Sequence, residues 1–151
     1  MTTREKIIYE ALSLFSINGY GAVTIREIAS AVGIKESSIY NHFENKQDIL
    51  NKIIDETLKR YYYTLESVQV PQSEDDNVSE LYNNITDEEF LDICVRIFLF
   101  YLRDDYISKL RRLLTIEQYG NEEIGELFRK VFIDRILETQ RRVLQKFIDS
   151  G

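Results

Sequence analysis

The chain contains few of the residues from which disulfides, metal sites and active sites are built. Its 151 residues include one cysteine and one histidine. Cys94 can form neither an internal disulfide nor a multi-cysteine metal site, which fits a reducing compartment, and we expect it to be a small buried hydrophobe. A glycine-rich phosphate loop and a metal-ligand spacing are also lacking. We therefore expect a protein that is not an enzyme, with no catalytic residues, no metal and no cofactor.

Long apolar runs are missing as well. No stretch approaches the roughly eighteen apolar residues of a membrane-spanning helix, and the N-terminus, MTTREKIIYEAL, mixes charges into its first turn. Apolar residues make up 44% and charged residues 30% of the chain, a balance typical of folded globular proteins. These features predict a cytoplasmic protein with no membrane partner.

Proline occurs once, at Pro71, within the polar and aperiodic stretch VQVPQSEDDNVSE, which we expect to be a loop. No alternating strand pattern bounded by turn residues is present, so the predicted fold class is all-α. Apolar residues instead recur at three- and four-residue intervals, first in a helix that ends at Asn18-Gly19. Its predicted buried face consists of Ile7, Ile8, Ala11, Leu12 and Phe15.

The segment TIREIASAVGIKESSIYNHF predicts a helix-turn-helix. Thr24 is placed to cap a short helix, and Glu27 completes a capping box three residues later. Gly33 ends this helix, because glycine accepts a left-handed backbone at little cost, and a second short helix begins near Lys35. Packing of Ile34, Ile39 and Phe43 would then turn a polar face toward solvent and toward a DNA major groove. That face comprises Lys35, Glu36, Ser37, Ser38, Tyr40 and Asn41.

Further helices are expected downstream. Asn45 is placed to cap one that starts at Lys46, with Ile49, Leu50, Ile53, Ile54, Thr57 and Leu58 on its packing side. Another begins at Asp87 and breaks at Asp104-Asp105, and it is apolar enough to be central. Its apolar residues are Phe90, Leu91, Cys94, Ile97, Phe98 and Tyr101. A helix over 106–118 and a long one from Glu122 to the end follow. The packing face expected on the last helix consists of Ile133, Ile136, Leu137, Leu144, Phe147 and Ile148.

Residues 24–29 (TIREIA), 32–34 (VGI) and 39–43 (IYNHF) together with Lys46 resemble the TetR family of transcriptional repressors. The resemblance covers the first third of the chain in detail. It implies that Tyr40, His42 and Lys46 contact DNA phosphates, for which all three carry hydrogen-bond donors. From its capping position at the start of a helix, Thr24 can reach a phosphate in the same way. A lysine at a helix N-terminus is electrostatically unfavourable unless an anion is near, which supports a phosphate at Lys46.

The recognition helix departs from the family pattern in two places. Lys35 stands where the family often has a serine or threonine cap, so the cap is weaker. Glu36 repels phosphate but can accept a hydrogen bond from cytosine N4, and can therefore contribute to base selection. Ser37 and Ser38 are small enough to let the helix approach the bases closely.

The resemblance also implies a homodimer whose small-molecule effector, bound in the body, changes the spacing of two DNA-binding heads. We expect a three-helix head over residues 1–47 and a helical ligand-binding and dimerisation body over 48–151. Family members usually continue past the position of Gly151, so the resemblance implies either a shortened family member or an incomplete chain. Aromatic side chains that can line an effector site, with core packing as the alternative for each, are Tyr62, Phe98, Tyr101 and Tyr119.

Net charge weighs against a nucleic-acid partner, because the chain carries −7 at neutral pH. The excess lies downstream, however, since residues 1–60 contain eight basic and eight acidic side chains. A neutral head can bind DNA if the acidic body points away. The predicted function is a repressor released from operator DNA by a small molecule. The alternative is a helical module of the same fold that binds a ligand or a protein and does not act through DNA.

Overall fold

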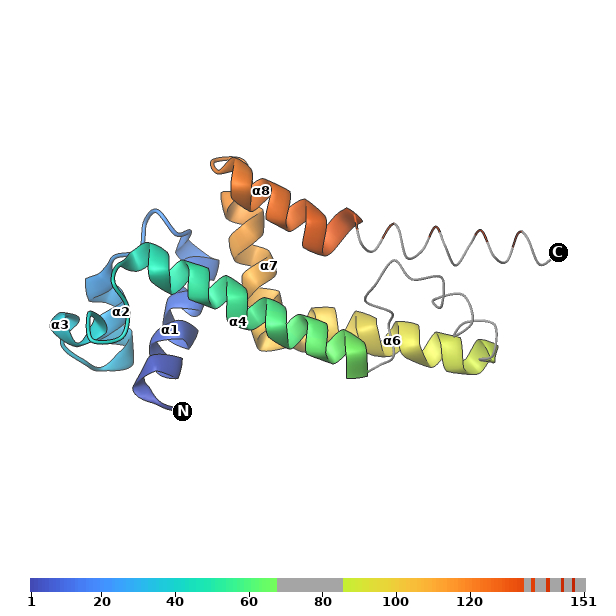
Figure 1. Ribbon diagram of the computed structural model, residues 1–151, viewed down its shortest axis with the longest axis horizontal. Coiled ribbons are helices and arrows are strands. Elements are labelled where there is room, and N and C mark those ends of the chain that lie inside the picture. The colour runs from blue at the N-terminus through green and yellow to red at the C-terminus, as the bar shows by residue number, and fades with distance from the viewer. Residues whose placement is uncertain (68–85, 135–136, 138–140, 142–144, 146–147, 149–151) are drawn as a thin grey trace.

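The computed structural model describes residues 1–67 and 86–134, together with residues 137, 141, 145 and 148. Every regular element in these ranges is helical, as the sequence predicts (Figure 1). The elements are α1 (Thr3–Asn18), α2 (Ile25–Val32), α3 (Glu36–Ile39), α4 (Lys46–Ser67), α6 (Asp87–Arg103), α7 (Asp105–Glu117), α8 (Glu122–Arg129) and a π-helical segment, η1 (Lys130–Asp134). The predicted loop around Pro71 and the predicted packing residues Ile136, Leu144 and Phe147 lie outside the described residues. The other three members of that predicted packing face, Ile133, Leu137 and Ile148, are exposed.

Side chains set where the helices begin. Thr2, Thr24 and Thr86 each accept a hydrogen bond from the backbone N–H three residues later, and a glutamate at that position bonds back to the cap, which completes a capping box. Asp104 ends α6 and caps α7 by accepting from the N–H of Ile107 at 3.0 Å. This confirms the predicted break, because a residue that caps the next helix has left the first one.

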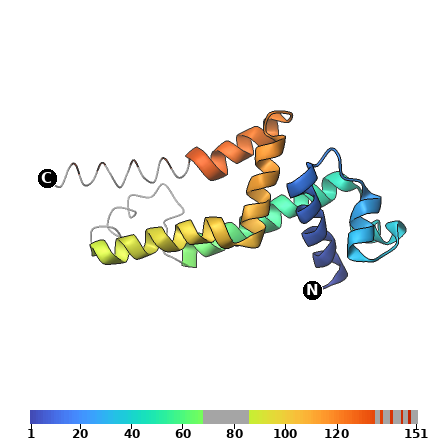
Figure 2. The same cartoon turned by 180° about the vertical axis from the view of Figure 1, so that it is seen from behind.

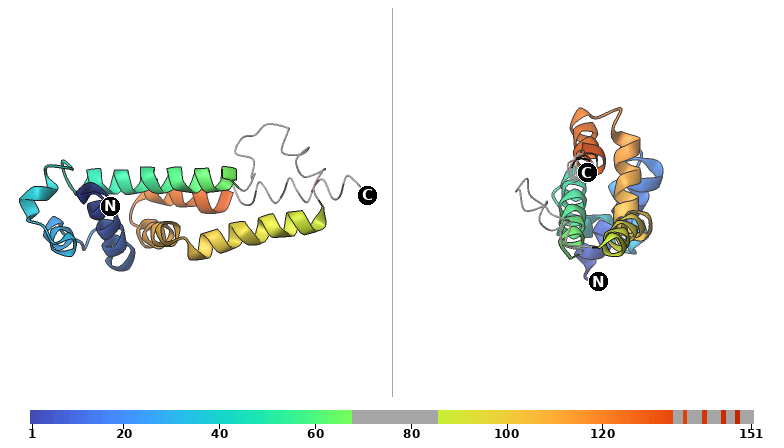
Figure 3. Two further views of the ribbon diagram at one scale, coloured as in Figure 1. Left: turned by 90° about the horizontal axis from the view of Figure 1, so that it is seen from below. Right: turned by 90° about the vertical axis from the view of Figure 1, so that its right-hand side faces the viewer.

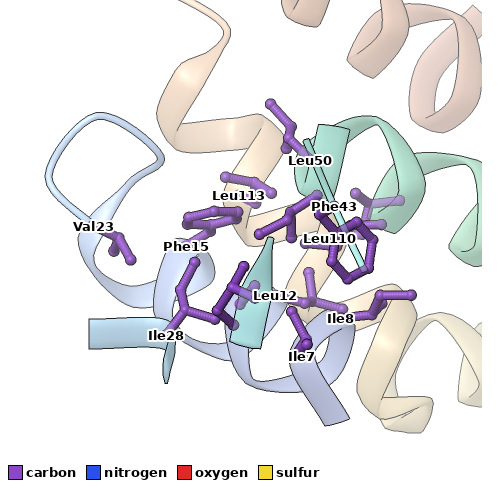
Figure 4. Close-up of a cluster of buried hydrophobic side chains, with 14 of the residues drawn as sticks. Ile7, Ile8, Leu12, Phe15, Val23, Ile28, Phe43, Leu50, Leu110 and Leu113 are labelled. Atoms are coloured by element: carbon purple, nitrogen blue, oxygen red, sulfur yellow. The ribbon is translucent and has the colours of Figure 1, made fainter. Parts of the chain in front are cut away.

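The main hydrophobic core joins the head to the body. Buried side chains of α1, α2, α3 and α4 meet those of α7 and α8 in one cluster (Figure 4). Leu110, Leu113 and Leu114 of α7 are fully buried beside Leu12 and Phe15 of α1. The predicted domain boundary between residues 47 and 48 remains a prediction. It falls within the first turn of α4, and one continuous core contains side chains from both sides of it.

A second cluster lies in the body, farther along α4. Its buried members are Tyr61, Leu65, Ile93, Ile107 and Val131, contributed by α4, α6, α7 and η1. Figure 3 shows α4 and α6 running along the length of the body. The cluster holds the distal half of α4 to the rest of the body.

The prediction that the Asp87 helix is central is wrong. Leu91, Val95, Phe98 and Leu102 of α6 are exposed, and Cys94, expected to be buried, is exposed as well. In the described part of the chain only one side of α6 packs inward, through Ile93 and the half-buried residues near it. Apolar composition shows that a helix has buried surface somewhere, but it does not show which faces its own chain covers.

Candidate nucleic-acid interface

The turn between α2 and α3 has the predicted glycine geometry. Gly33 adopts φ 78° and ψ 31°, the left-handed conformation, and its N–H reaches the carbonyl oxygens of Ala29 and Ser30. The N–H of Ile34 donates to the same Ala29 oxygen at 3.0 Å. These bonds satisfy carbonyls that the end of α2 would otherwise leave free, so α3 can begin two residues later.

Core side chains hold α3 against the head. The helix has a single turn, and its N-cap, Lys35, makes no side-chain capping hydrogen bond, as the weak cap predicted. Ile39 and Phe43 are buried and anchor the turn and the loop after it. The guanidinium of Arg4 lies 5.1 Å from the centre of the Phe43 ring and 3.1 Å from Glu56 Oε1 on α4. Tertiary packing therefore supplies the order that so short a helix cannot have alone.

α3 and the loop after it, which carry the predicted DNA-facing residues 35–42, lie at the end of the head away from α6 and α8 (Figures 1 and 2). Tyr40 is 54% exposed, and Ser38 is half-buried at the edge of the packed face. The remaining exposed members are Lys35, Glu36, Ser37, Asn41 and His42. The structure brings these residues together on a solvent-facing surface, and contact of each with DNA stays a prediction.

Thr24 is exposed, but its hydroxyl is already engaged. It donates to Glu27 Oε2 at 2.7 Å and accepts from the Glu27 N–H at 3.2 Å, while the Thr24 N–H also donates to Glu27 Oε2. Hydrogen bonds from the Thr24 side chain and backbone lower the pKa of Glu27. The hydroxyl would have to leave the Glu27 carboxylate before donating to a phosphate.

Lys46 has partners that the sequence did not reveal. Its Nζ donates to the carbonyl oxygens of Tyr20 and Val23, both at 2.8 Å, and lies 4.3 Å from the centre of the Tyr20 ring. These oxygens provide the negative partners that a lysine at a helix N-terminus needs. An ammonium has three N–H donors, so one remains beyond the two carbonyl bonds, and phosphate contact by Lys46 stays a prediction.

Tyr20 and Glu117 are contributors that sequence reasoning missed. The backbone N–H of Tyr20 donates to Glu117 Oε1 at 2.8 Å, and its hydroxyl donates to Gln47 Oε1 at 3.0 Å. Burial, followed by the negative charge of Glu117, raises the pKa of Tyr20. No sequence signal links positions 97 residues apart. The loop after α1 is thus bonded to both the end of α7 and the start of α4.

The four aromatic candidates for an effector site differ in how far they are buried and in what they contact. Tyr101 belongs to the body cluster, and its hydroxyl lies 2.5 Å from that of Tyr61. Tyr62 is 36% exposed, Phe98 on the outer side of α6 is 62% exposed, and Tyr119 after α7 is 91% exposed. Tyr62 and Tyr101 both contact the buried Tyr61 ring, at 5.2 Å and 5.8 Å between ring centres, so these two candidates sit among the body aromatics that could enclose a ligand, and their role stays a prediction.

Residues 7–53 match the family model described as bacterial regulatory proteins, tetR family. The biofilm operon icaADBC HTH-type negative transcriptional regulator IcaR of Staphylococcus epidermidis is 40% identical over 52 residues, which are 34% of this chain and 28% of that protein. IcaR of Staphylococcus aureus strain Newman is 41% identical over 51 residues, 34% of this chain and 27% of that protein. The matched segment thus spans less than a third of these curated relatives.

A crystal structure described as that of a TetR-family transcriptional regulator from Mesorhizobium loti has the same fold. It superimposes with a TM-score of 0.63 at 23% identity, over 99% of this chain and 69% of the other. The resemblance in fold therefore extends beyond the matched head into the body. Among the described helices, none has the length and apolar character needed to cross a membrane.

Proposed function

We propose, from the premise that residues 7–53 form a DNA-binding head of the tetR family, that this protein is a transcriptional repressor that binds operator DNA. The observation that carries the proposal is the exposed polar surface of α3 and the loop after it, held in place by the buried side chains of Ile39 and Phe43. A rigid helix presented in this way can enter the major groove. Such a protein would act where the chromosome is, in the cytoplasm.

The chemistry of the surface assigns a role to each part. Tyr40, Asn41 and His42 are exposed donors beside the helix and would bond phosphate oxygens, as would Lys35. Thr24, capping α2, would reach a phosphate after releasing Glu27. Glu36 and Ser37 are exposed on α3 itself, with half-buried Ser38 beside them, and would face base edges.

The test is binding to the DNA upstream of the protein's own gene at two salt concentrations. Wild-type protein should bind this fragment more tightly than an unrelated one, and tightly enough at low salt to show a clear salt dependence. Tyr40→Phe removes only the phenol oxygen and should weaken binding to all sequences alike, whereas Tyr119→Phe, at an exposed tyrosine outside the head, should not. Equal, weak binding to both fragments at low salt would instead favour the helical ligand- or protein-binding module.

The proposed working form is a homodimer. Two recognition helices that read successive major grooves must lie one DNA turn, about 34 to 36 Å, apart. Apolar surface on the described body, chiefly the α6 stripe of Leu91, Val95, Phe98 and Leu102, supports association, because such patches often mark contact surfaces. Sedimentation should show a dimer on the operator, and inserting about half a DNA turn, roughly 5 base pairs, between half-sites should abolish tight binding. A monomer that binds both DNAs equally would contradict this.

We further propose that a small molecule bound in the body releases the DNA. Support comes from the aromatic cluster in which the Tyr61 ring lies 5.8 Å from Tyr101 and 6.4 Å from Phe100, measured between ring centres. Aromatic walls of this kind suit an apolar or aromatic effector. Candidate ligands should lower the affinity for operator DNA and change tyrosine fluorescence together. A ligand that changes fluorescence and leaves DNA affinity untouched would not be the effector.

A further inference from the structure

One carboxylate of the body reaches into the head. Glu117 is the last residue of α7, and its Oε1 accepts the backbone N–H of Tyr20 at 2.8 Å. It lies so close to the chain that a Cβ on Gly19 would come within 2.9 Å of it. The backbone oxygen of Glu117 accepts from the N–H groups of Gly120 and Asn121. The same residue therefore bonds the head loop with its side chain and the turn between α7 and α8 with its backbone.

Tyr20 continues this connection to α4. Its carbonyl oxygen accepts from Lys46 Nζ, its ring lies beneath that ammonium, and its hydroxyl bonds Gln47. Every polar group of Tyr20 is thus bonded either to Glu117 or to the first two residues of α4. A displacement of Tyr20 would move the acceptor that holds the Lys46 ammonium.

We propose that Glu117 is a positioning residue for DNA binding, which acts through Tyr20 to hold the Lys46 ammonium where a phosphate can meet it. The proposal rests on the proposed function and adds a body residue to the DNA-binding machinery. A free lysine side chain gives up about 0.5–1.5 kcal/mol of rotamer freedom when it is immobilised by a partner. The hydrogen bonds to two carbonyl oxygens already hold the Lys46 side chain in place, so contact with a phosphate would cost less side-chain entropy.

A positioning role and a purely electrostatic role of Glu117 predict different changes in DNA affinity. Glu117 is negative, so by charge alone its neutralisation would favour binding to DNA. If Glu117 acts by positioning Tyr20, the affinity for DNA depends instead on whether an acceptor atom still reaches the Tyr20 N–H. Glu117→Gln removes the charge and keeps the reach, whereas Glu117→Asp keeps the charge and shortens the side chain by one methylene.

The experiment measures operator affinity for the full chain and for E117D and E117Q at two salt concentrations, with E123Q as control. Glu123 is an exposed acid in the first turn of α8, so E123Q gives the effect of charge alone. We expect E117D to bind about three- to tenfold more weakly, the effect of losing one hydrogen bond. E117Q should bind at least as tightly as E123Q. Unchanged binding by E117D, or weaker binding by E117Q than by E123Q, would overturn the proposal.

A double-mutant cycle separates positioning from a general loss of stability. If Glu117 acts through Lys46, then E117D should have little further effect on DNA affinity once Lys46 has been replaced by alanine. Additive losses would show that Glu117 does not act through Lys46. If the wild-type protein shows no specific, salt-dependent DNA binding, the proposed function and this inference are both overturned. If the wild type binds DNA but the losses caused by E117D and Lys46→Ala are additive, only this inference is overturned.

Discussion

Three glycines of the head offer a graded test of how its turns are held. Gly33 and Gly19 have positive φ values of 78° and 81°, and Gly21 does not. A Cβ at Gly33 or Gly21 would meet nothing within 4 Å, whereas one at Gly19 would lie 2.9 Å from Glu117 Oε1 and 3.4 Å from Ile116 Cγ2. Substitution by alanine should therefore add no strain at Gly21, backbone strain alone at Gly33, and backbone strain together with a clash at Gly19.

The expected losses of unfolding free energy follow from these differences. Gly33→Ala forces an ordinary residue into the left-handed region, which costs about 1–2 kcal/mol. Gly19 has ψ 157°, in a region almost restricted to glycine, where strain is about 1–3 kcal/mol. Displacing Glu117 from the Tyr20 N–H adds roughly 1 kcal/mol, so Gly19→Ala should cost about 2–4 kcal/mol. Gly21→Ala should be neutral or slightly stabilising, because alanine restricts the unfolded chain.

Urea unfolding followed by circular dichroism at 222 nm measures these differences, provided that the m-values of the variants agree. In thermal scans each kcal/mol should lower Tm by about 2–4 °C for a chain of this size. The order of loss should be Gly19, Gly33 and Gly21. A Gly19→Ala variant no less stable than Gly33→Ala would refute the close approach of Glu117, and a destabilised Gly21→Ala would refute the assignment of the losses to backbone conformation.

Three further outcomes are expected. Ser38→Ala and Glu36→Gln should change base preference in a binding selection with randomised operators, and a uniform loss across all sequences would count against direct base contact. Phe43→Ala should lower the free energy of unfolding by about 3–5 kcal/mol in urea titration, because the ring is buried in the main core with Arg4 over it, and a loss below 1 kcal/mol would contradict its role as an anchor. The hydrogen bond from Lys109 lowers the pKa of Asp105, so its stabilising effect is present above about pH 4 and is lost as the pH falls through the lowered pKa. Asp105→Asn should accordingly reduce the fall in unfolding free energy with decreasing pH below about pH 4. Near neutral pH it should change this free energy by less than 1 kcal/mol, since the Lys109–Asp105 pair is partly exposed. An unchanged pH dependence below about pH 4 would refute this.

The sequence alone determined the features that depend on neighbours a few residues apart. Thr24 and Glu27 form the capping box that their spacing predicts, and Gly33 adopts the left-handed conformation. Asp104 ends α6 and caps α7. The buried faces of α1 and α4 follow their three- and four-residue periodicity. Caps, turns and amphipathic periodicity are local properties, so they can be read before any long-range contact is known.

Only the tertiary structure decided which surfaces and charges meet across the chain. The exposed stripe of α6 and the exposed Cys94 depend on how far α4 and α7 cover that helix. The carbonyl partners of Lys46 and the carboxylate that holds Tyr20 come from segments 23 to 97 residues away in sequence. Periodicity shows that a helix face is apolar, and composition shows that a charge is present. Which residues contact that face or that charge depends on the packing of helices that are distant in the chain, and no local pattern encodes this packing.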